Sequence, residues 1–376
     1  MSRHFSTRIR HVKMVGHREV IKKQEKQIST PAKRGRELDR LNVGIVGLGD
    51  NWESRYRPAL RQLMDRLKVQ AICDPVARRA ELAAQESAAS AVDSFQALVR
   101  RSDVSAVLIL GPGWFGPLPA FASCVLGKPV FLANPTELSL DEVREIRRRA
   151  IAGNAMVMVG FGRRLSPATI RLKELAATRL GAPQIVFCHR RLPMPALPIE
   201  KIWRLMLREL VEQVDWCNYI IGRPARWVMG VAFPQFSGEH PAGYTMLSLD
   251  YSEESFGTGP IAQISCGCYF PSQWQEAIHY RPPPLLQVRC RNGVAFVDPP
   301  STVVWFDEAG QHFETVEQEK SVEEQLLLHF YWAATQQGCR PSELDDAYRA
   351  ILTVHEAQRS FREGRRLELT FQESES

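Results

Sequence analysis

A glycine turn, Gly47-Leu48-Gly49, is the part of this chain whose residue types fit a chemical task. It follows an apolar run and precedes a segment that we expect to be helical. In that context the glycines let the backbone approach a pyrophosphate at a helix N-terminus. Asp74 ends the next apolar run, where an acid accepts from a ribose 2′-hydroxyl and repels a 2′-phosphate. We therefore predict a site that favours NAD over NADP. Its cofactor-binding residues are Gly47, Gly49, Asp50, Asn51, Trp52 and Asp74.

The elements that position this turn alternate between strands and helices. The expected strands are apolar throughout, which suits a parallel sheet buried on both faces. This alternation predicts an α/β fold with an N-terminal Rossmann dinucleotide-binding domain over residues 41–162. After the strand that opens at Leu41, the expected strands are Val69–Cys73, Ser105–Leu110, Pro129–Leu132 and Ala155–Val159. The expected helices are Tyr56–Leu67, Ala77–Gln85 and Ala120–Leu126.

Beyond Gly160 the strands follow one another directly. Asn292-Gly293 is a typical hairpin turn, and a second hairpin is expected across Glu308-Ala309-Gly310. We predict an α+β substrate and oligomerisation domain with a largely antiparallel open sheet over residues 163–376. The expected strands are Gln184–His189, Trp227–Val231, Thr245–Tyr251, Ile261–Tyr269, Leu286–Arg291, Val294–Val297, Val303–Phe306 and His312–Val316. The expected closing helices are Val322–Gln337 and Ser342–Glu363.

Charge is distributed unevenly along the 376 residues. Residues 1–40 carry a net charge of +8 and lack apolar periodicity, so we expect a disordered basic arm. The remainder carries a net charge of −2, which does not favour a nucleic-acid surface. No apolar run is long enough to predict a membrane span. The eight cysteines lack metal-ligand spacing, so we expect no metal site, reduced thiols and a cytoplasmic location.

Several short motifs occur in the order and spacing of one known family. They are Lys128–Pro135 (KPVFLANP), Arg57–Leu60 (RPAL), Gly160–Ala168 (GFGRRLSPA) and His355–Leu369 (HEAQRSFREGRRLEL), together with the glycine turn. With them the chain resembles the glucose–fructose oxidoreductase / inositol dehydrogenase / rhizopine-catabolism (Gfo/Idh/MocA) family over most of residues 41–370. The resemblance implies an NAD(P)-dependent oxidoreductase that acts on a small sugar- or polyol-like ligand and forms a homo-oligomer.

The resemblance also places functional positions on unusual residues of the cofactor lobe. In the family signature G-K-x-V-x-x-E-K-P, the lysine stands beside the hydride-transfer site, and Asn134 holds its place here. The third fingerprint glycine falls on Trp52, which must either displace the helix or turn over the site. The family's T-P-x-x-x-H begins here with Gly111-Pro112 and lacks the threonine and the histidine. Gly111 and Pro112 join the predicted cofactor-binding residues.

A helix with the family pattern D-x-x-x-H completes the implied site. Aligned on this chain, the pattern puts Arg208 at the aspartate and Glu212 at the histidine, with Asp215 on a neighbouring face. The predicted catalytic residues are therefore Asn134, Arg208, Glu212 and Asp215. Arg208 could hold an anionic substrate, and Glu212 could act as a base. Alternatively, Arg208 and Glu212 form an ordinary ion pair at i and i+4.

Three functions remain open from these residues. Because an uncharged Asn134 cannot exchange a proton with a sugar hydroxyl, the first is an NAD-binding protein with non-standard or silent chemistry. The second is an active NAD-dependent sugar or polyol dehydrogenase with a relocated acid/base group. The third is a non-catalytic protein that binds a sugar or nucleotide, or serves in assembly.

Overall fold

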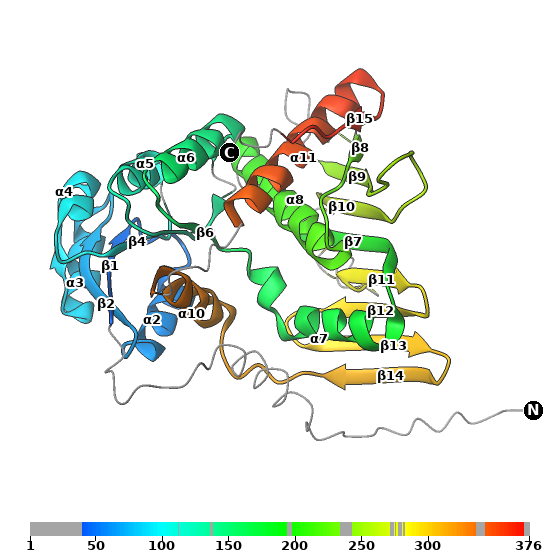
Figure 1. Ribbon diagram of the computed structural model, residues 1–376, viewed down its shortest axis with the longest axis horizontal. Helices are drawn as coiled ribbons and strands as arrows, with labels where there is room; N and C mark the ends of the chain where they lie inside the picture. Colours follow the sequence, from blue (N-terminus) through cyan, green and yellow to red (C-terminus); the bar gives the residue numbers. More distant parts are fainter. Residues whose placement is uncertain are drawn as a thin grey trace, which may run out of the picture. The chain divides into compact units, whose positions relative to one another are not determined.

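The computed structural model describes most of the chain from Arg40 onward. The described residues are 40–111, 113–135, 138–193, 198–233, 243–270, 274, 276, 280, 283–335 and 343–371. The predicted basic arm over residues 1–40 lies outside them except for Arg40, and so does the predicted cofactor residue Pro112. Within the described part, two separate sheets form the framework (Figure 1).

The first sheet has six strands in the order β3-β2-β1-β4-β5-β6, and every neighbouring pair is parallel. The direction of strand succession reverses between β1 and β4, which defines the switch point of a doubly wound sheet. The predicted Rossmann-type fold is therefore confirmed. The strands are β1 (Leu41–Val46), β2 (Leu67–Cys73), β3 (Ser90–Ala91), β4 (Ala106–Ile109), β5 (Val130–Leu132) and β6 (Val157–Val159).

Helices cover both faces of this sheet, which explains why its strands are apolar throughout. Helices α2, α3 and α10 pack with Ile45 and Phe131 on one face, whereas α4, α5 and α6 pack with Val46 and Leu132 on the other. Helix α10 follows the second sheet in the chain but returns to the first (Figure 1). The helices are α2 (Arg57–Gln62), α3 (Ala77–Ser87), α4 (Phe95–Arg100), α5 (Leu118–Val125), α6 (Leu140–Ala152) and α10 (Val322–Thr335).

The second sheet has nine strands in the order β14-β13-β12-β11-β7-β10-β9-β8-β15. The β7–β10 pair is parallel and the other neighbours are antiparallel, so the predicted largely antiparallel sheet is confirmed. Both predicted hairpins are present, as β11–β12 and β13–β14. The strands are β7 (Pro183–Pro193), β8 (Trp227–Phe233), β9 (Tyr244–Asp250), β10 (Ile261–Phe270), β11 (Leu286–Cys290), β12 (Gly293–Asp298), β13 (Thr302–Asp307), β14 (Gly310–Thr315) and β15 (Leu367–Glu368).

Among the described residues, the helices that contact the second sheet lie on one face of it (Figure 1). Along β8 and β9, buried residues alternate with exposed ones, as expected when one face packs on a core. The buried face contacts α7 (Pro167–Leu175), α8 (Ile199–Ile221) and α11 (Glu343–Glu363). Helix α8 packs on the central strands β7 and β10 of this sheet.

The helix that follows the glycine turn differs from the prediction. We expected Tyr56–Leu67, but the structure has a π-helical turn η1 (Trp52–Tyr56) that continues into α2, and β2 already begins at Leu67. Trp52 is only 3 % exposed and packs in the core with Ile45 and Leu48. Burial of the large apolar indole is more favourable in free energy than its exposure to solvent. The wider π turn places the Trp52 side chain in the core.

Candidate functional site

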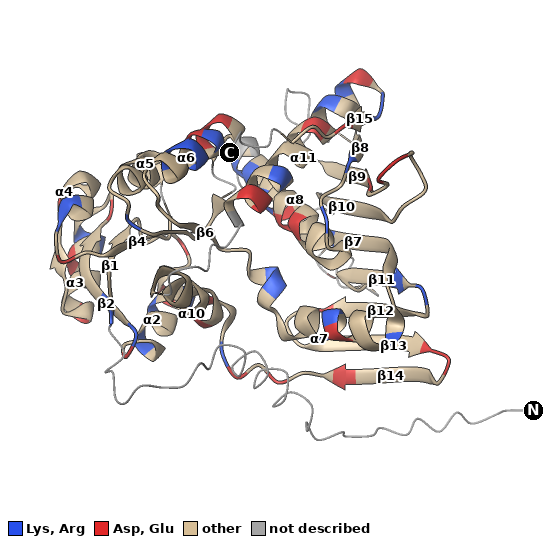
Figure 2. Cartoon of the chain, viewed as in Figure 1, with Lys and Arg blue, Asp and Glu red and all other residues tan. Residues whose placement is uncertain are grey.

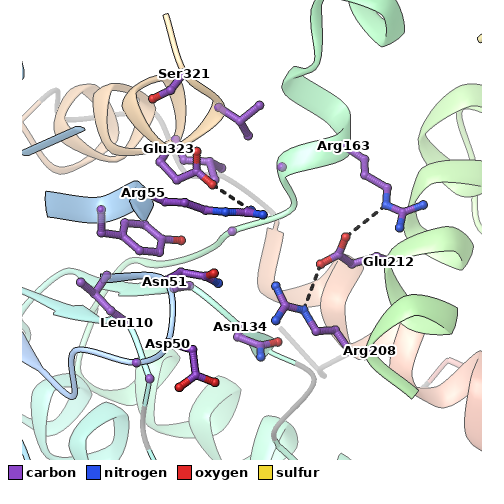
Figure 3. Close-up of a pocket in the computed structure, with 18 of the residues that line it drawn as sticks. Asp50, Asn51, Arg55, Leu110, Asn134, Arg163, Arg208, Glu212, Ser321 and Glu323 are labelled. Atoms are coloured by element: carbon purple, nitrogen blue, oxygen red, sulfur yellow. Dashed lines mark hydrogen bonds and ion pairs between the residues drawn. The ribbon is translucent and has the colours of Figure 1, made fainter. Parts of the chain in front are cut away.

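A cleft with a volume of about 780 Å³ opens at the carboxyl ends of β1 and β4. This is the switch point of the first sheet, where doubly wound proteins bind their ligands. One wall comes from the loops after β1, β4 and β5, and the other from η4 (Gly162–Leu165) and α8 (Figure 3). The amino-terminal part of α10 lines the cleft as well.

The glycines of the two loops pack backbone against backbone at the base of the cleft. Gly47 and Gly49 have φ values of +65° and +67°, a region that favours glycine. The Gly111 amide donates to the Gly47 carbonyl over 3.0 Å. A Cβ on Gly111 would lie 2.5 Å from the Gly49 Cα. Gly49 and Gly111 line the cleft. A Cβ would clash at Gly111, and at Gly49 it would lie 3.0 Å from the Leu110 carbonyl oxygen at a positive φ.

Asp74 lies at the edge of the cleft and organises the glycine turn. Its carboxylate accepts from the amides of Leu48 and Val76, each over 2.9 Å. Arg79 donates to the Gly49 carbonyl over 2.8 Å, and its Nη1 lies 3.9 Å from Asp74 Oδ2. A guanidinium therefore accompanies the acid that was predicted to accept from a ribose.

The other predicted residues of this turn separate into two groups. Asp50 and Asn51 line the cleft, and Figure 3 shows both side chains beside it. Trp52 does not line the cleft, because it is buried in the core behind the turn. The sequence left two alternatives for Trp52, a displaced helix or an indole that turns over the site. The structure has the first, because the helix begins with a π turn and the indole is buried.

Three of the four predicted catalytic residues meet in the cleft. Asn134 follows β5 on one wall, while Arg208 and Glu212 project from α8 on the other (Figure 3). Arg208 Nε lies 3.5 Å from Glu212 Oε1, so the predicted ion pair at i and i+4 is present. Its location at the cleft means that both side chains can also contact a ligand.

Glu212 is additionally held by an arginine that the sequence did not single out. Arg163 Nε donates to Glu212 Oε2 over 3.1 Å, and Arg163 Nη2 donates to Glu209 over 2.5 Å. Burial lowers the pKa of the Arg163 guanidinium, but Glu209 and Glu212 outweigh burial and raise it above its ordinary value. Each oxygen of Glu212 therefore faces a guanidinium.

Asp215 is separated from the other three. Its side chain is 2 % exposed, does not line the cleft and accepts two hydrogen bonds from Arg164. Arg164 also donates to Asp346 of α11 over 2.9 Å. Burial raises the pKa of Asp215 to about 6, while Arg164 opposes the shift. This position suits a carboxylate that joins η4 to α8 and α11.

The cleft also contains side chains that no sequence motif singled out. Arg55 donates to Glu323 of α10 over 3.2 Å, which links residues 268 positions apart. Tyr56 is 6 % exposed but lines the cleft. Burial, and then the charge of Glu323, raises its pKa above the ordinary value, so its phenol is protonated. Arg55, Tyr56 and Glu323 come together because α10 packs on the first sheet.

Other features of the described residues bear on the site's chemistry. No group of three His, Cys, Asp or Glu side chains that could hold a metal is found among them. Their seven cysteines are buried and free. In the same part of the chain, no helix is long and apolar enough to cross a membrane.

The sequence of this chain is similar to those of known oxidoreductases. Residues 41–161 match the profile described as "Oxidoreductase family, NAD-binding Rossmann fold" (GFO_IDH_MocA). Inositol 2-dehydrogenase 4 of Saccharopolyspora erythraea is 29 % identical over 238 residues, which cover 62 % of this chain and 69 % of that protein. Inositol 2-dehydrogenase of Cereibacter sphaeroides is 30 % identical over 235 residues, which cover 61 % and 68 %.

A solved structure has the same fold at low identity. An aldose-aldose oxidoreductase from Caulobacter crescentus, complexed with glycerol, superimposes with a TM-score of 0.74. The match covers 88 % of this chain and 100 % of that chain at 16 % identity. At this identity the match establishes the arrangement of the two sheets.

Proposed function

This chain belongs to the Gfo/Idh/MocA family of NAD-binding oxidoreductases, and from that premise we propose that its cleft binds NAD beside a small sugar- or polyol-like ligand. We further propose that its chemistry is non-standard or silent. The observation that carries the second part is the absence of lysine and histidine among the described lining residues, which include Asn134, the residue that the resemblance aligns with the family's lysine. The inositol dehydrogenases among its relatives support a cyclitol or sugar as the ligand class.

The base of the cleft fits a dinucleotide. Gly49 and Gly111 leave a surface without side chains next to the start of η1, which suits the close approach of a pyrophosphate. Asp50, Asn51 and Asp74 offer polar groups for the ribose. When bound, NAD supplies a hydride acceptor to such a site. The Asp74 carboxylate supports NAD over NADP, although Arg79 beside it reduces the repulsion of a 2′-phosphate.

The residues of the cleft away from the glycine loops, Asn134 and Glu212, are better suited to bind a ligand than to transfer a proton. Asn134 has an amide that can donate and accept but cannot ionise. Glu212 is the nearest candidate for a relocated base, and it favours the alternative of an active dehydrogenase because it lines the cleft. However, both of its oxygens face guanidinium groups, at 3.1 and 3.5 Å. A carboxylate engaged in this way binds a hydroxyl more readily than it removes a proton.

The first prediction concerns cofactor binding. In a thermal-shift titration with NAD, NADH, NADP and NADPH, we expect stabilisation by NAD(H) at lower concentration than by NADP(H). A ligand at 100 times its dissociation constant adds about 2.7 kcal/mol to the free energy of unfolding. Absence of a shift with all four dinucleotides would end the proposal.

NADH formation across a panel of polyols and sugars then separates silent from active chemistry. We expect no turnover above background, or a kcat at saturating substrate that Glu212→Gln leaves largely unchanged. Turnover that disappears in Glu212→Gln would instead establish the active alternative with a relocated base. A general base contributes about 10²–10⁴-fold in rate, so its loss is readily measured.

We also propose that the chain forms a homo-oligomer through the open face of the second sheet. The face that α7, α8 and α11 leave uncovered presents a group of exposed apolar residues on strands β7, β8 and β9. They are Phe187, Met229, Val231, Phe233 and Met246, between 38 % and 65 % exposed. Val231 and Met246 are cross-strand partners. An apolar patch of this kind on a sheet without a covering layer supports burial against a second copy.

The second prediction is that Met246→Glu converts the oligomer to a monomer, since a charge would have to be buried without a partner. Size-exclusion chromatography with light scattering measures the result. Met64→Glu is the matched control, because Met64 is 64 % exposed and lies outside the second sheet. A wild-type protein that is monomeric at micromolar concentration would contradict the proposal.

A further inference from the structure

Arg208 differs from the other arginines near the cleft in how little of its hydrogen-bonding capacity the protein uses. Arg163 and Arg164 each contact two carboxylates, and the guanidinium of Arg55 donates to Glu323. Arg208 has one polar contact among the described residues, the 3.5 Å ion pair from its Nε to Glu212. This distance is long for a charge-assisted hydrogen bond.

The unused part of Arg208 is the part that recognises anions. Its Nη1 and Nη2 donate no hydrogen bond within the described part of the chain, and its side chain is 36 % exposed in the cleft. Figure 3 shows the guanidinium directed from α8 into the space beside Asn134. Two parallel N–H groups of this kind match the two oxygens of a carboxylate.

The residues around Arg208 indicate how much negative charge a ligand can carry there and which other polar groups it needs. Both signs of charge occur along α8 (Figure 2), and Glu209 and Glu212 also line the cleft. A singly charged carboxylate can bind Arg208 in this setting with less repulsion than a doubly charged phosphate. Around it, the Asn134 amide and the Glu212 carboxylate can bind hydroxyl groups.

We propose that the second ligand of this cleft is a polyhydroxy acid, such as an aldonic or uronic acid, whose carboxylate binds Arg208. This inference rests on the proposed function and specifies its substrate class. Arg208 is then the residue that selects the acid over the neutral sugar, while Asn134 and Glu212 bind hydroxyls. Arg163 acts through Glu212, because its guanidinium keeps that carboxylate in position.

The test is a comparison of matched acids and neutral compounds. Calorimetric titrations with the NAD-saturated protein would use gluconate against glucitol and glucuronate against glucose. We expect at least one acid to bind about tenfold or more tightly than its neutral partner, as a charge-assisted pair predicts. Equal affinities, or no binding by either acid, would overturn the inference. A glucose 6-phosphate arm that binds more tightly than both acids would also overturn it.

Variants connect the preference to Arg208. Arg208→Gln should remove the difference between acid and neutral compound, whereas Arg208→Lys, which keeps the charge without the fork, should retain part of it. Arg204→Gln is the matched control one turn earlier on α8, because Arg204 is exposed and does not line the cleft. A preference that survives Arg208→Gln overturns the inference. The NAD thermal shift of each variant reports separately on the proposed function.

Discussion

Arg164→Met is expected to lower the free energy of unfolding by about 3–5 kcal/mol at pH 8, the cost of removing one partner of a buried ion pair. Arg164 is 16 % exposed and donates to Asp215 and Asp346, which lie on two different helices. Methionine fills part of the space but leaves Asp215 buried without a counter-charge. Urea unfolding, followed by tryptophan fluorescence, measures the loss.

The loss should depend on pH in a defined direction. Burial raises the pKa of Asp215 from 3.8 to about 6, and Arg164 opposes this shift, so its removal raises the folded-state pKa further. A raised folded-state pKa contributes stability that is present below the unfolded-state pKa and is lost as pH rises through the folded-state pKa. The destabilisation of Arg164→Met should therefore be smaller at pH 5 than at pH 8.

A second substitution isolates the charge. Asp215→Asn in the Arg164→Met background removes the carboxylate, so the double variant should be more stable than Arg164→Met at pH 8. Its own free energy of unfolding should also vary less with pH than that of Arg164→Met, since no carboxyl at position 215 titrates. An Arg164→Met variant that is equally destabilised at pH 5 and pH 8 would show that Asp215 does not carry the cost.

Gly111→Ala is expected to weaken NAD binding by at least about tenfold and to lower the free energy of unfolding by about 1–3 kcal/mol, because the added methyl group overpacks a rigid contact. The new Cβ would lie 2.5 Å from the Gly49 Cα and 2.9 Å from the Gly49 nitrogen. Both atoms belong to the backbone, so the cofactor turn itself must move. NADH fluorescence titration and urea unfolding measure the two effects.

Gly116→Ala is the control for this variant. Gly116 lies after the same strand, has a φ of +52° and would place its Cβ with no atom within 4 Å. It therefore adds backbone strain without a clash and does not line the cleft. We expect its NADH affinity to stay close to that of the wild type. If both variants lose NADH binding equally, the contact between Gly49 and Gly111 is not the cause.

The two sheets could be predicted because their signals are local. Apolar runs that alternate with helices indicated the parallel sheet, and Asn292-Gly293 indicated the hairpin that joins β11 to β12. The glycine turn was also recognisable, since Gly47 and Gly49 satisfy a backbone requirement of their own positions. Helix α6 escaped prediction although Ser139 and Glu142 form a capping box at its start.

The predicted domain boundary at residues 162 and 163 stays a proposal, and α10 shows why such a boundary is hard to place from sequence. This helix lies within the predicted second segment but packs on the first sheet through Leu327 and Phe330. Its apolar side chains do not specify which of the two sheets receives them. Tyr56 and Arg55 obtained their neighbour Glu323 through this packing.

The sequence by itself determined the fold class, and it predicted the cofactor turn and the position of Asn134 at the family's lysine, since these depend on residue types at local spacing. The tertiary structure decided which charges face the cleft. Arg163 and Arg164 are adjacent in the chain, yet one contacts Glu212 in the cleft and the other pairs with buried Asp215. Glu212 and Asp215 are three residues apart on one helix, so only the packing of α8 against its neighbours places one at the cleft and the other in the interior.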